Sequence, residues 1–305
     1  MEIRVLKYFL TVAREGSITG AANYLHLTQP TLSRQLQDLE RELGQKLIIR
    51  GSHNISLTPE GMILRKRAEE ILDMVEKTEK EFSSLKNEIA GEIFIGSGET
   101  SSIKCVAEVI KEIQAQYPNI KFNLYSGNAD DVGEKLDKGL LDFGILIQPT
   151  DISKYEYLSL KSYDTWGLVM RKDSPLASKD FITIDDLFDI PLIASRQVDK
   201  ITTVKNEYIE WFGENRKNLN IVARYNLIYN AAIMVEQGVG YALGLDGLIN
   251  TTGSNELCFR PLKPLLKSGL NMVWKKYQVF SPAAKLFLEK MQEKIVSLSE
   301  SENPC

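Results

Sequence analysis

A run of apolar residues with a period of 3.5 extends through residues 64–89, and it constrains the fold more than any other feature. The steps alternate between four and three residues, which is the a/d spacing of a coiled-coil helix. One helix of this length cannot bury such a stripe alone. The sequence therefore predicts a long helix over 59–90 that pairs with the same helix of a second subunit; packing on its own C-terminal domain is the alternative. The stripe consists of Leu64, Ala68, Ile71, Val75, Thr78, Phe82, Leu85 and Ile89.

The segment before this helix, residues 1–58, has helical spacing and then a hairpin pattern. Gly16 ends one helix, Ser17 can cap a second, and Thr28 can cap a third whose first turn contains Pro30. Two β-prone runs then flank the turn-rich tetrad "GSHN" at 51–54. Two short helices, a third helix and a hairpin predict a winged helix-turn-helix domain over residues 1–58.

The third helix has two distinct faces. Leu32, Leu36, Leu39 and Leu43 fall on one side, and the opposite side is polar. In a winged helix this element enters the DNA major groove; an ordinary solvated surface helix is the alternative. Amide side chains there can bond base edges, hydroxyls can bond phosphates, and arginines can do either. The polar candidates are Gln29, Thr31, Ser33, Arg34 and Gln37, with Arg50 at the hairpin base.

Charge is distributed unevenly along a chain whose net charge is −4. Residues 1–67 hold 10 Lys+Arg against 6 Asp+Glu, a net of +4, and residues 91–305 hold 24 against 28, a net of −4. A basic N-terminal segment joined to an acidic remainder is typical of a small nucleic-acid-binding domain attached to another domain. The N-terminus lacks the pattern of a signal peptide or membrane span, and the three cysteines are far apart. These features predict a cytoplasmic protein that has no disulfide framework and no membrane contact.

Residues 91–305 alternate between strand-like and helix-like segments. Strands near 93–97, 120–127 and 141–147 enclose two helices, a βαβαβ pattern that predicts a parallel sheet covered on both faces. A second βα series begins at Trp166, which predicts two α/β halves with a cleft between them. We place subdomain I at about 91–163 and 269–305, and subdomain II at about 164–268. Ligands of such sheets bind at the carboxyl ends of the strands.

The combination of these segments resembles the LysR-type transcriptional regulators. That family has the N-terminal pattern A-A-x-x-L-x-x-[ST]-Q-[PS]-x-[LV]-S-x-x-[IL]-x-x-L-E. The residues that match this pattern are Ala21, Ala22, Leu25, Thr28, Gln29, Pro30, Leu32, Ser33, Leu36, Leu39 and Glu40, and "SLTPEG" and the long helix follow them. The segments "DFGILI" and "VEQGVGYALG" resemble the effector domain of the family more loosely.

The resemblance implies an α+β multidomain protein: a winged helix-turn-helix, a linker helix and a bilobed effector-binding domain of the periplasmic-binding-protein type. It implies a homodimer or homotetramer that binds a promoter dyad in double-stranded DNA and a small-molecule effector, with no cofactor or metal. RNA polymerase is an expected partner. The predicted DNA contacts are Thr28, Gln29, Pro30, Thr31, Ser33, Arg34, Gln37 and Arg50; the predicted effector contacts are Gly98, Glu99, Thr100, Ser101, Ser102, Gln148, Pro149, Ser195, Thr202, Thr203 and Asn226.

Two positions depart from the family pattern. Glu99 stands at a helix start that would otherwise favour anions. We expect its charged side chain to face solvent, which leaves the cleft suited to an anion; a Glu99 that faces the cleft would favour an amine or an uncharged ligand instead. The other departure is "GLDGLI" at 244–249, where relatives commonly have Leu-Pro.

Other classes of protein fit less well. An enzyme is disfavoured because "GVGYALG" precedes a strand, the reverse of a dinucleotide loop, and because both histidines lie in the first 58 residues, away from Ser97. A thiol sensor is disfavoured because Cys105 and Cys258 fall at expected core positions. A solute-binding protein would need an export signal and would not need the N-terminal module.

Overall fold

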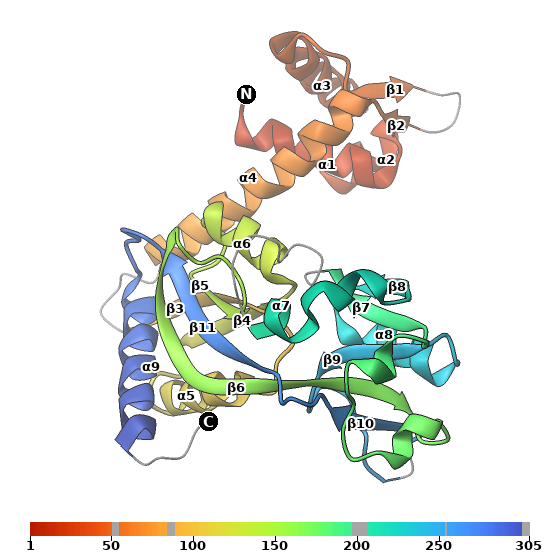
Figure 1. The fold of residues 1–305 in the computed structure, drawn as a ribbon. Coiled ribbons are helices and arrows are strands. Elements are labelled where there is room, and N and C mark those ends of the chain that lie inside the picture. Colours follow the sequence, from red (N-terminus) through yellow and green to blue (C-terminus); the bar gives the residue numbers. More distant parts are fainter. Residues whose placement is uncertain (51–54, 84–88, 197–206, 254, 301–305) are drawn as a thin grey trace. The chain divides into compact units, whose positions relative to one another are not determined.

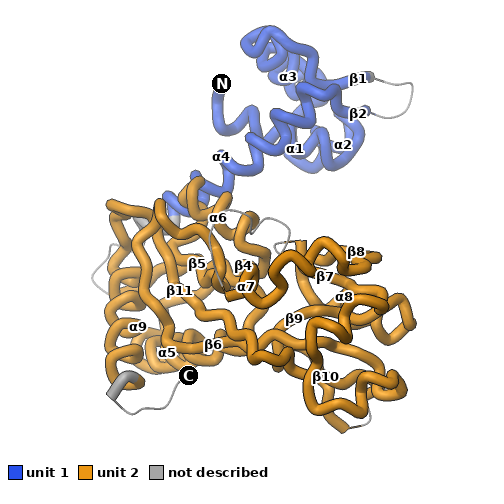
Figure 2. The backbone as a smooth tube through the Cα atoms, in the orientation of Figure 1, with its two compact units in different colours: residues 1–83 blue, residues 84–305 orange. Residues whose placement is uncertain are grey.

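The computed structural model describes residues 1–50, 55–83, 89–196, 207–253 and 255–300 (Figure 1). The chain divides into two compact units, Met1–Ser83 and Ser84–Cys305, which Figure 2 colours separately. No helix within the described ranges is long and apolar enough to cross a membrane.

Unit 1 is a small helical domain with a two-stranded wing. Ser17 accepts a hydrogen bond from the Gly20 backbone N–H (3.2 Å) and so caps the second helix. Thr28 accepts one from the Thr31 N–H (3.4 Å) at the start of the third. The elements are α1 (Ile3–Glu15), α2 (Ile18–Tyr24), α3 (Gln29–Leu43), β1 (Ile48–Arg50), β2 (Ile55–Leu57) and α4 (Pro59–Ser83).

The core of unit 1 forms where the apolar faces of these helices meet. Leu32, Leu36 and Leu39 of α3 are buried against α1 and α2, as their spacing predicts. Leu43 was expected on the same face but is 39% exposed, because α3 ends there and Gly44 turns the chain away with a left-handed φ of 67°. The small Ala21 and Ala22 of α2 are fully buried and allow the close helix approach.

A buried glutamate joins α3 to the wing. Glu40 accepts hydrogen bonds from the Leu47 N–H (2.9 Å) and the Ile48 N–H (3.4 Å), and its other oxygen pairs with Lys46 (2.9 Å). Burial alone would raise the pKa of the Glu40 carboxyl, but these hydrogen bonds together hold that pKa below its ordinary value. The ionised carboxylate therefore fixes the chain where it leaves α3.

The start of α4 is packed tightly against the same turn. Thr58 accepts from the Gly61 N–H (2.9 Å) and donates to the Lys46 carbonyl (2.7 Å). A Cβ built on Gly61 would lie 2.1 Å from the Leu47 carbonyl oxygen, so only glycine fits there. This contact explains the glycine of the "LTPEG" segment.

Unit 2 contains a long mixed sheet in the order β4-β3-β5-β11-β6-β9-β7-β8, with β10 also paired to β6. The strands β3, β4 and β5 are mutually parallel in one lobe, as β7, β8 and β9 are in the other. The bounds are β3 (Gly91–Ser97), β4 (Ile120–Ser126), β5 (Phe143–Ile147), β6 (Tyr155–Arg171), β7 (Leu192–Ser195), β8 (Ile221–Tyr225), β9 (Tyr241–Leu245), β10 (Leu257–Pro261) and β11 (Lys267–Lys275).

Helices cover both faces of the sheet in each lobe (Figure 1). In the first lobe α5 and α9 bury one face around Phe143 and Phe287, and α6 buries the other around Val132. In the second lobe α7 and α8 take the two faces. The helices are α5 (Ile103–Gln116), α6 (Ala129–Asp137), α7 (Glu207–Phe212), α8 (Ile228–Glu236) and α9 (Pro282–Glu300), with short 3-10 turns at Pro175–Ser178, Asp185–Leu187 and Gly213–Asn218.

The predicted parallel pairing is confirmed for β3, β4 and β5, but the sheet as a whole is mixed. The 17-residue strand β6 runs through both lobes; it pairs antiparallel with β11 in the first and with β9 and β10 in the second. Our prediction began this strand at Trp166 and so missed its first half. The reason is that Tyr155–Lys161 alternates buried and exposed residues weakly, with Glu156 and Lys161 inside a short apolar pattern.

Candidate DNA-binding surface and effector cleft

The outer face of α3 is a continuous polar surface. Gln29, Pro30, Thr31, Arg34 and Gln37 are exposed, and Ser33 is half-buried beside them. The hydroxyls of Thr28 and Thr31 bond one another (2.8 Å) at the helix start. The exposed amide, hydroxyl and guanidinium groups of this face suit contacts with phosphates and the adjacent base edges.

The wing belongs to the same unit and is joined to α3 through Glu40. Its strands pair antiparallel, with Arg50 opposite Ile55. The Ile55 N–H donates to the Gly16 carbonyl (2.8 Å), which ties the wing to the turn between α1 and α2. The side chain of Arg50 and the hairpin tip at 51–54 lie outside the described residues.

The predicted dimerisation stripe on α4 divides into two parts. Leu64 packs against the unit 1 core and Ala68 is fully buried on a helix that contacts α1, so both already pack inside their own chain. Ile71 and Val75 are half-buried, and Thr78 is exposed. The side chain of Phe82 and all of Leu85 lie outside the described residues. The part of the stripe beyond Ala68 is what remains for a second subunit.

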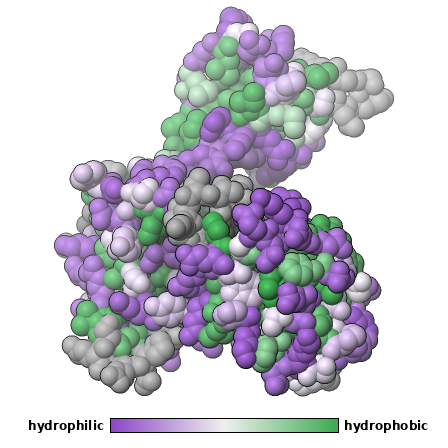
Figure 3. Space-filling model, viewed as in Figure 1, coloured by the Kyte–Doolittle hydropathy of each residue, from purple (hydrophilic) through white to green (hydrophobic). Residues whose placement is uncertain are grey.

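Exposed hydrophobic side chains are also present elsewhere on both units. On the face in Figure 3 they alternate with hydrophilic residues and do not form one broad patch. Met62 and Ile63 on α4 are 65% and 66% exposed. They are adjacent to the stripe in sequence but point away from it.

A small cavity of about 60 Å³ lies between the two lobes of unit 2. The β3–α5 turn and α6 start contribute from the first lobe, and β7 and the β8–α8 turn contribute from the second. Among the predicted effector contacts, Gly98, Glu99, Ser195 and Asn226 line it. The other lining residues are Gly127, Asn128, Ile147, Trp166, Tyr225, Leu227, Ile228, Leu245 and Leu248.

A larger cavity of about 590 Å³ lies along the strands β6 and β11 where they pass between the lobes. Gln148 and Pro149, both predicted effector contacts, are in its wall. Gln148 Oε1 accepts from the Thr150 N–H (3.2 Å), and within the described residues its buried Nε2 has no hydrogen-bond partner. The wall is completed by Ser159, Tyr163, Glu207, Tyr208, Lys267, Ser268, Gly269, Leu270 and Asn271.

The three hydroxyl side chains that follow β3 have a different hydrogen-bond partner from the one we predicted. We predicted that Thr100, Ser101 and Ser102 offer their donors to an effector; instead all three donate to the Asp164 carboxylate, at 2.6, 3.2 and 3.2 Å. Asp164 lies on β6 and is 2% exposed. Burial raises the pKa of Asp164 although these hydrogen bonds oppose that rise. The donors are therefore occupied by a carboxylate of the chain itself.

The expectation that Glu99 faces solvent is wrong. Its Oε2 accepts a hydrogen bond from the backbone N–H of Ile228 (2.6 Å), the first residue of α8 in the other lobe. The N-cap residue of α8 is Leu227, which has no side chain able to cap the helix. Glu99 thus supplies across the cleft the acceptor that the helix start requires.

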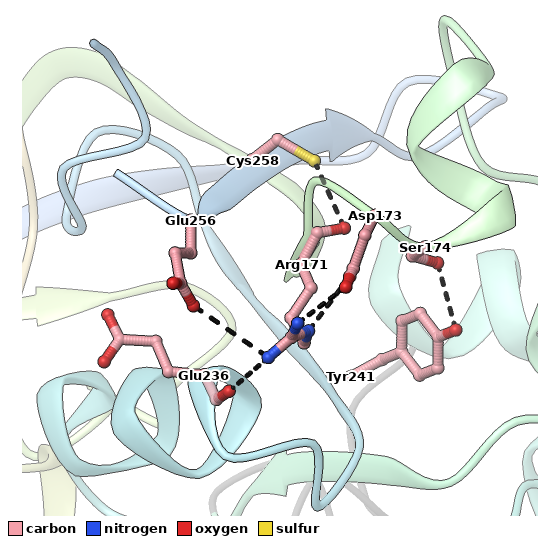
Figure 4. A network of polar contacts seen from close by, with 7 residues as sticks. All are labelled: Arg171, Asp173, Ser174, Glu236, Tyr241, Glu256 and Cys258. Carbon is pink, nitrogen blue, oxygen red and sulfur yellow. Dashed lines mark hydrogen bonds and ion pairs between the residues drawn. The ribbon is translucent and has the colours of Figure 1, made fainter. Parts of the chain in front are cut away.

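The opposite end of α8 carries a cation (Figure 4). The Arg171 guanidinium donates to the Glu236 carbonyl (2.8 Å) and makes two bonds to Asp173 (2.9 and 2.6 Å). A negative charge at the N-terminus and a positive charge at the C-terminus both match the helix dipole. Cys258 on β10 lies beside Arg171, and Cys105 lies on α5 in the core of the other lobe. Both are buried, which agrees with their expected place in the core.

Gly244 lets α8 take this position. A Cβ built there would lie 2.2 Å from Ile228 Cδ1 and 3.2 Å from the Tyr225 hydroxyl oxygen. The absence of a side chain at Gly244, the first residue of the "GLDGLI" segment, leaves room for the end of the Ile228 side chain beneath the start of α8. Thr202 and Thr203 lie outside the described residues. Among the residues that are described, no group of three His, Cys, Asp or Glu could hold a metal ion.

The models of two known protein families match this chain. Residues 3–62 match the model described as "Bacterial regulatory helix-turn-helix protein, lysR family", and residues 86–295 match the "LysR substrate binding domain". The chain belongs to the LysR family of transcriptional regulators. This LysR-type regulator thus has a DNA-binding helix-turn-helix domain and an effector-binding domain, and its family is not one of enzymes.

Relatives of this LysR-type regulator span nearly its whole length. It is 31% identical to the uncharacterised HTH-type transcriptional regulator YvbU of Bacillus subtilis over 96% of this chain and 98% of that protein. It is 28% identical to the Hca operon transcriptional activator HcaR of Escherichia coli over 98% and 100%. The crystal structure of CbnR, a LysR family regulator, shares the fold with a TM-score of 0.74 at 18% identity, over 97% and 99% of the two chains.

Two of the residues that the sequence analysis did not predict are Tyr225, which lines the smaller cavity, and Asp164, which is buried beneath the three hydroxyl side chains that follow β3 and lines neither cavity. Asp164 occurs in "SYDTWG" just before an apolar run, a place where a charged residue reads as a strand boundary. An acidic residue followed at once by a buried strand was the signal that could have marked it. Tyr225 ends β8 and donates to the Leu243 carbonyl (2.8 Å) within the cavity wall.

Proposed function

We propose that this regulator binds a DNA dyad through the outer face of α3 and responds to a small molecule held between the lobes of unit 2. The observation that carries the proposal is the exposed set Gln29, Thr31, Arg34 and Gln37 on a helix whose other face buries Leu32, Leu36 and Leu39. A buried apolar face fixes the orientation of the helix. The polar face is then presented as a rigid surface, as groove recognition requires.

The proposal extends to assembly and location. Two copies joined through α4 beyond Ala68 present two α3 helices, and hence recognise two half-sites. A structure of full-length CbnR with its target DNA has a TM-score of 0.74 to this chain at 19% identity, over 96% and 100% of the two chains, and supports this use of the fold. Contact with RNA polymerase and a cytoplasmic location follow from action at a promoter.

Arg34→Ala tests the recognition surface. We expect the variant to bind a specific DNA fragment about 5- to 150-fold more weakly, since loss of one good base-edge pair costs about 1–3 kcal/mol. Fluorescence anisotropy at fixed salt measures the affinity. Arg4→Ala is the matched control, because Arg4 is an exposed arginine of the same unit on α1, paired with Glu2 (3.3 Å). Equal losses for the two variants, or no loss for Arg34→Ala, would refute the assignment of α3.

A further inference from the structure

The start of α8 is an anion position that a side chain of the other lobe already fills. Glu99 and Ile228 are 129 residues apart, and the 2.6 Å hydrogen bond between them crosses the 60 Å³ cavity. The N-cap position holds Leu227, so helix α8 has no acceptor of its own there. An anion at this place is favoured by both the unpaired N–H groups and the dipole of a nine-residue helix.

The negative charge of Glu99 affects Tyr225 in the cavity wall. Burial raises the pKa of the Tyr225 hydroxyl, and the negative charge of Glu99 raises it further. The Tyr225 hydroxyl donates to the Leu243 carbonyl instead of to a ligand (2.8 Å). No Lys or Arg is among the described residues that line this cavity, so a second carboxylate would meet like charge at close range without a counter-ion.

A second carboxylate of the chain occupies the other group of donors in the cleft. Asp164 accepts from Thr100, Ser101 and Ser102 at the start of α5, as described above. The starts of α5 and α8 are therefore both bonded to carboxylates of the chain itself. Asp164 of strand β6 accepts the hydrogen bonds at the start of α5. Glu99 of the first lobe accepts the hydrogen bond at the start of α8.

We propose that Glu99 is a specificity-determining residue: its carboxylate stands in for an anionic ligand at α8, joins the two lobes and excludes carboxylate effectors from the 60 Å³ cavity. The inference rests on the proposed effector-binding function of unit 2. It predicts that the effector of this regulator lacks a carboxylate at that position, and that removing Glu99 creates a site for a small carboxylate. Acetate is the probe, because it has the size and charge of the side-chain terminus that Glu99→Ala removes.

The test is chemical rescue in the full-length chain. Glu99→Ala is expected to unfold about 2–4 °C below the parent chain, because a helix start loses its acceptor. Sodium acetate, compared with sodium chloride at equal ionic strength, should raise the Tm of Glu99→Ala in a saturable way. It should also restore hydrogen-exchange protection at 228–236. Glu99→Ser serves as a second variant should the alanine form fail to fold.

Arg171→Ala is the matched control, because Arg171 binds the opposite end of the same helix. Acetate that raises the Tm of Glu99→Ala but not of the parent chain or Arg171→Ala supports the proposal. An equal response of all three proteins, or no response of either Glu99 variant, overturns it. The acetate experiment uses no DNA. Its result is therefore independent of whether α3 is the DNA-recognition helix.

Discussion

Gly61→Ala is expected to destabilise the winged-helix unit by about 3 kcal/mol, the upper end of the usual range for overpacking. The added Cβ would lie 2.1 Å from the Leu47 carbonyl oxygen and 3.0 Å from its carbon. Both are backbone atoms held by the Thr58 N–H, which donates to that carbonyl (3.1 Å), and by Glu40 on the adjacent amides. No flexible side chain can move aside, so α4 must shift away from the wing.

Hydrogen exchange resolved by peptide measures this effect in the full-length chain, since the two units can unfold separately. Protection should fall across residues 1–83 and remain unchanged in unit 2. Gly20→Ala is the control: its Cβ would lie 3.5 Å from Ser17 Cβ, 3.7 Å from Ser17 Oγ and 3.8 Å from Glu15 Cβ, all ordinary van der Waals contacts. That variant should be neutral or more stable by about 0.5–1 kcal/mol. Similar behaviour of the two variants would contradict the packing account of the α4 start.

The double variant Ile71→Glu, Val75→Glu is expected to dissociate the assembly and to weaken specific DNA binding strongly. Both side chains are half-buried on α4 beyond the part that packs on α1. Two carboxylates in an apolar helix pair would be desolvated without partners, which is costly. A monomer has one recognition helix, so it loses the gain in affinity that two linked half-sites provide.

Sedimentation velocity at micromolar concentration measures the assembly. Met62→Glu, Ile63→Glu is matched in charge and helix but changes exposed residues outside the stripe, so it should keep the parent's sedimentation coefficient. An unchanged coefficient for the stripe variant would mean that α4 does not hold the subunits together. A loss of assembly in both double variants would indicate general damage to α4.

The helices of unit 1 could be predicted from the sequence because their signals are local. Caps at Ser17 and Thr28, the left-handed glycines Gly16 and Gly44, and the spacing of Leu32, Leu36 and Leu39 each depend on neighbours within one or two turns. The prediction that Leu43 is buried failed because the last turn of a helix has no following turn to cover it. The role of Gly61 depends on a carbonyl 14 residues away and was not predicted.

The cleft was harder to predict because its contacts are long-range. Thr100 and Asp164 are 64 residues apart, and Glu99 and Ile228 are 129 apart. The sequence placed the loops correctly at the carboxyl ends of strands, yet it could not indicate which side chains would satisfy one another there. Because charged side chains are mostly exposed in proteins, we expected Glu99 to be solvated. The absence of a capping side chain at Leu227 was the local sign that an acceptor must come from elsewhere.

Selection of binding sites from a pool of random double-stranded DNA tests the central claim most directly. The full-length parent chain should enrich a dyad of two related half-sites whose centres lie about one helical turn, or a small multiple of it, apart. Arg34→Ala should fail to enrich the same dyad, and Arg4→Ala should recover it. Enrichment of a single asymmetric site, or of no sequence above the starting pool, would contradict a regulator that reads DNA through paired copies of α3.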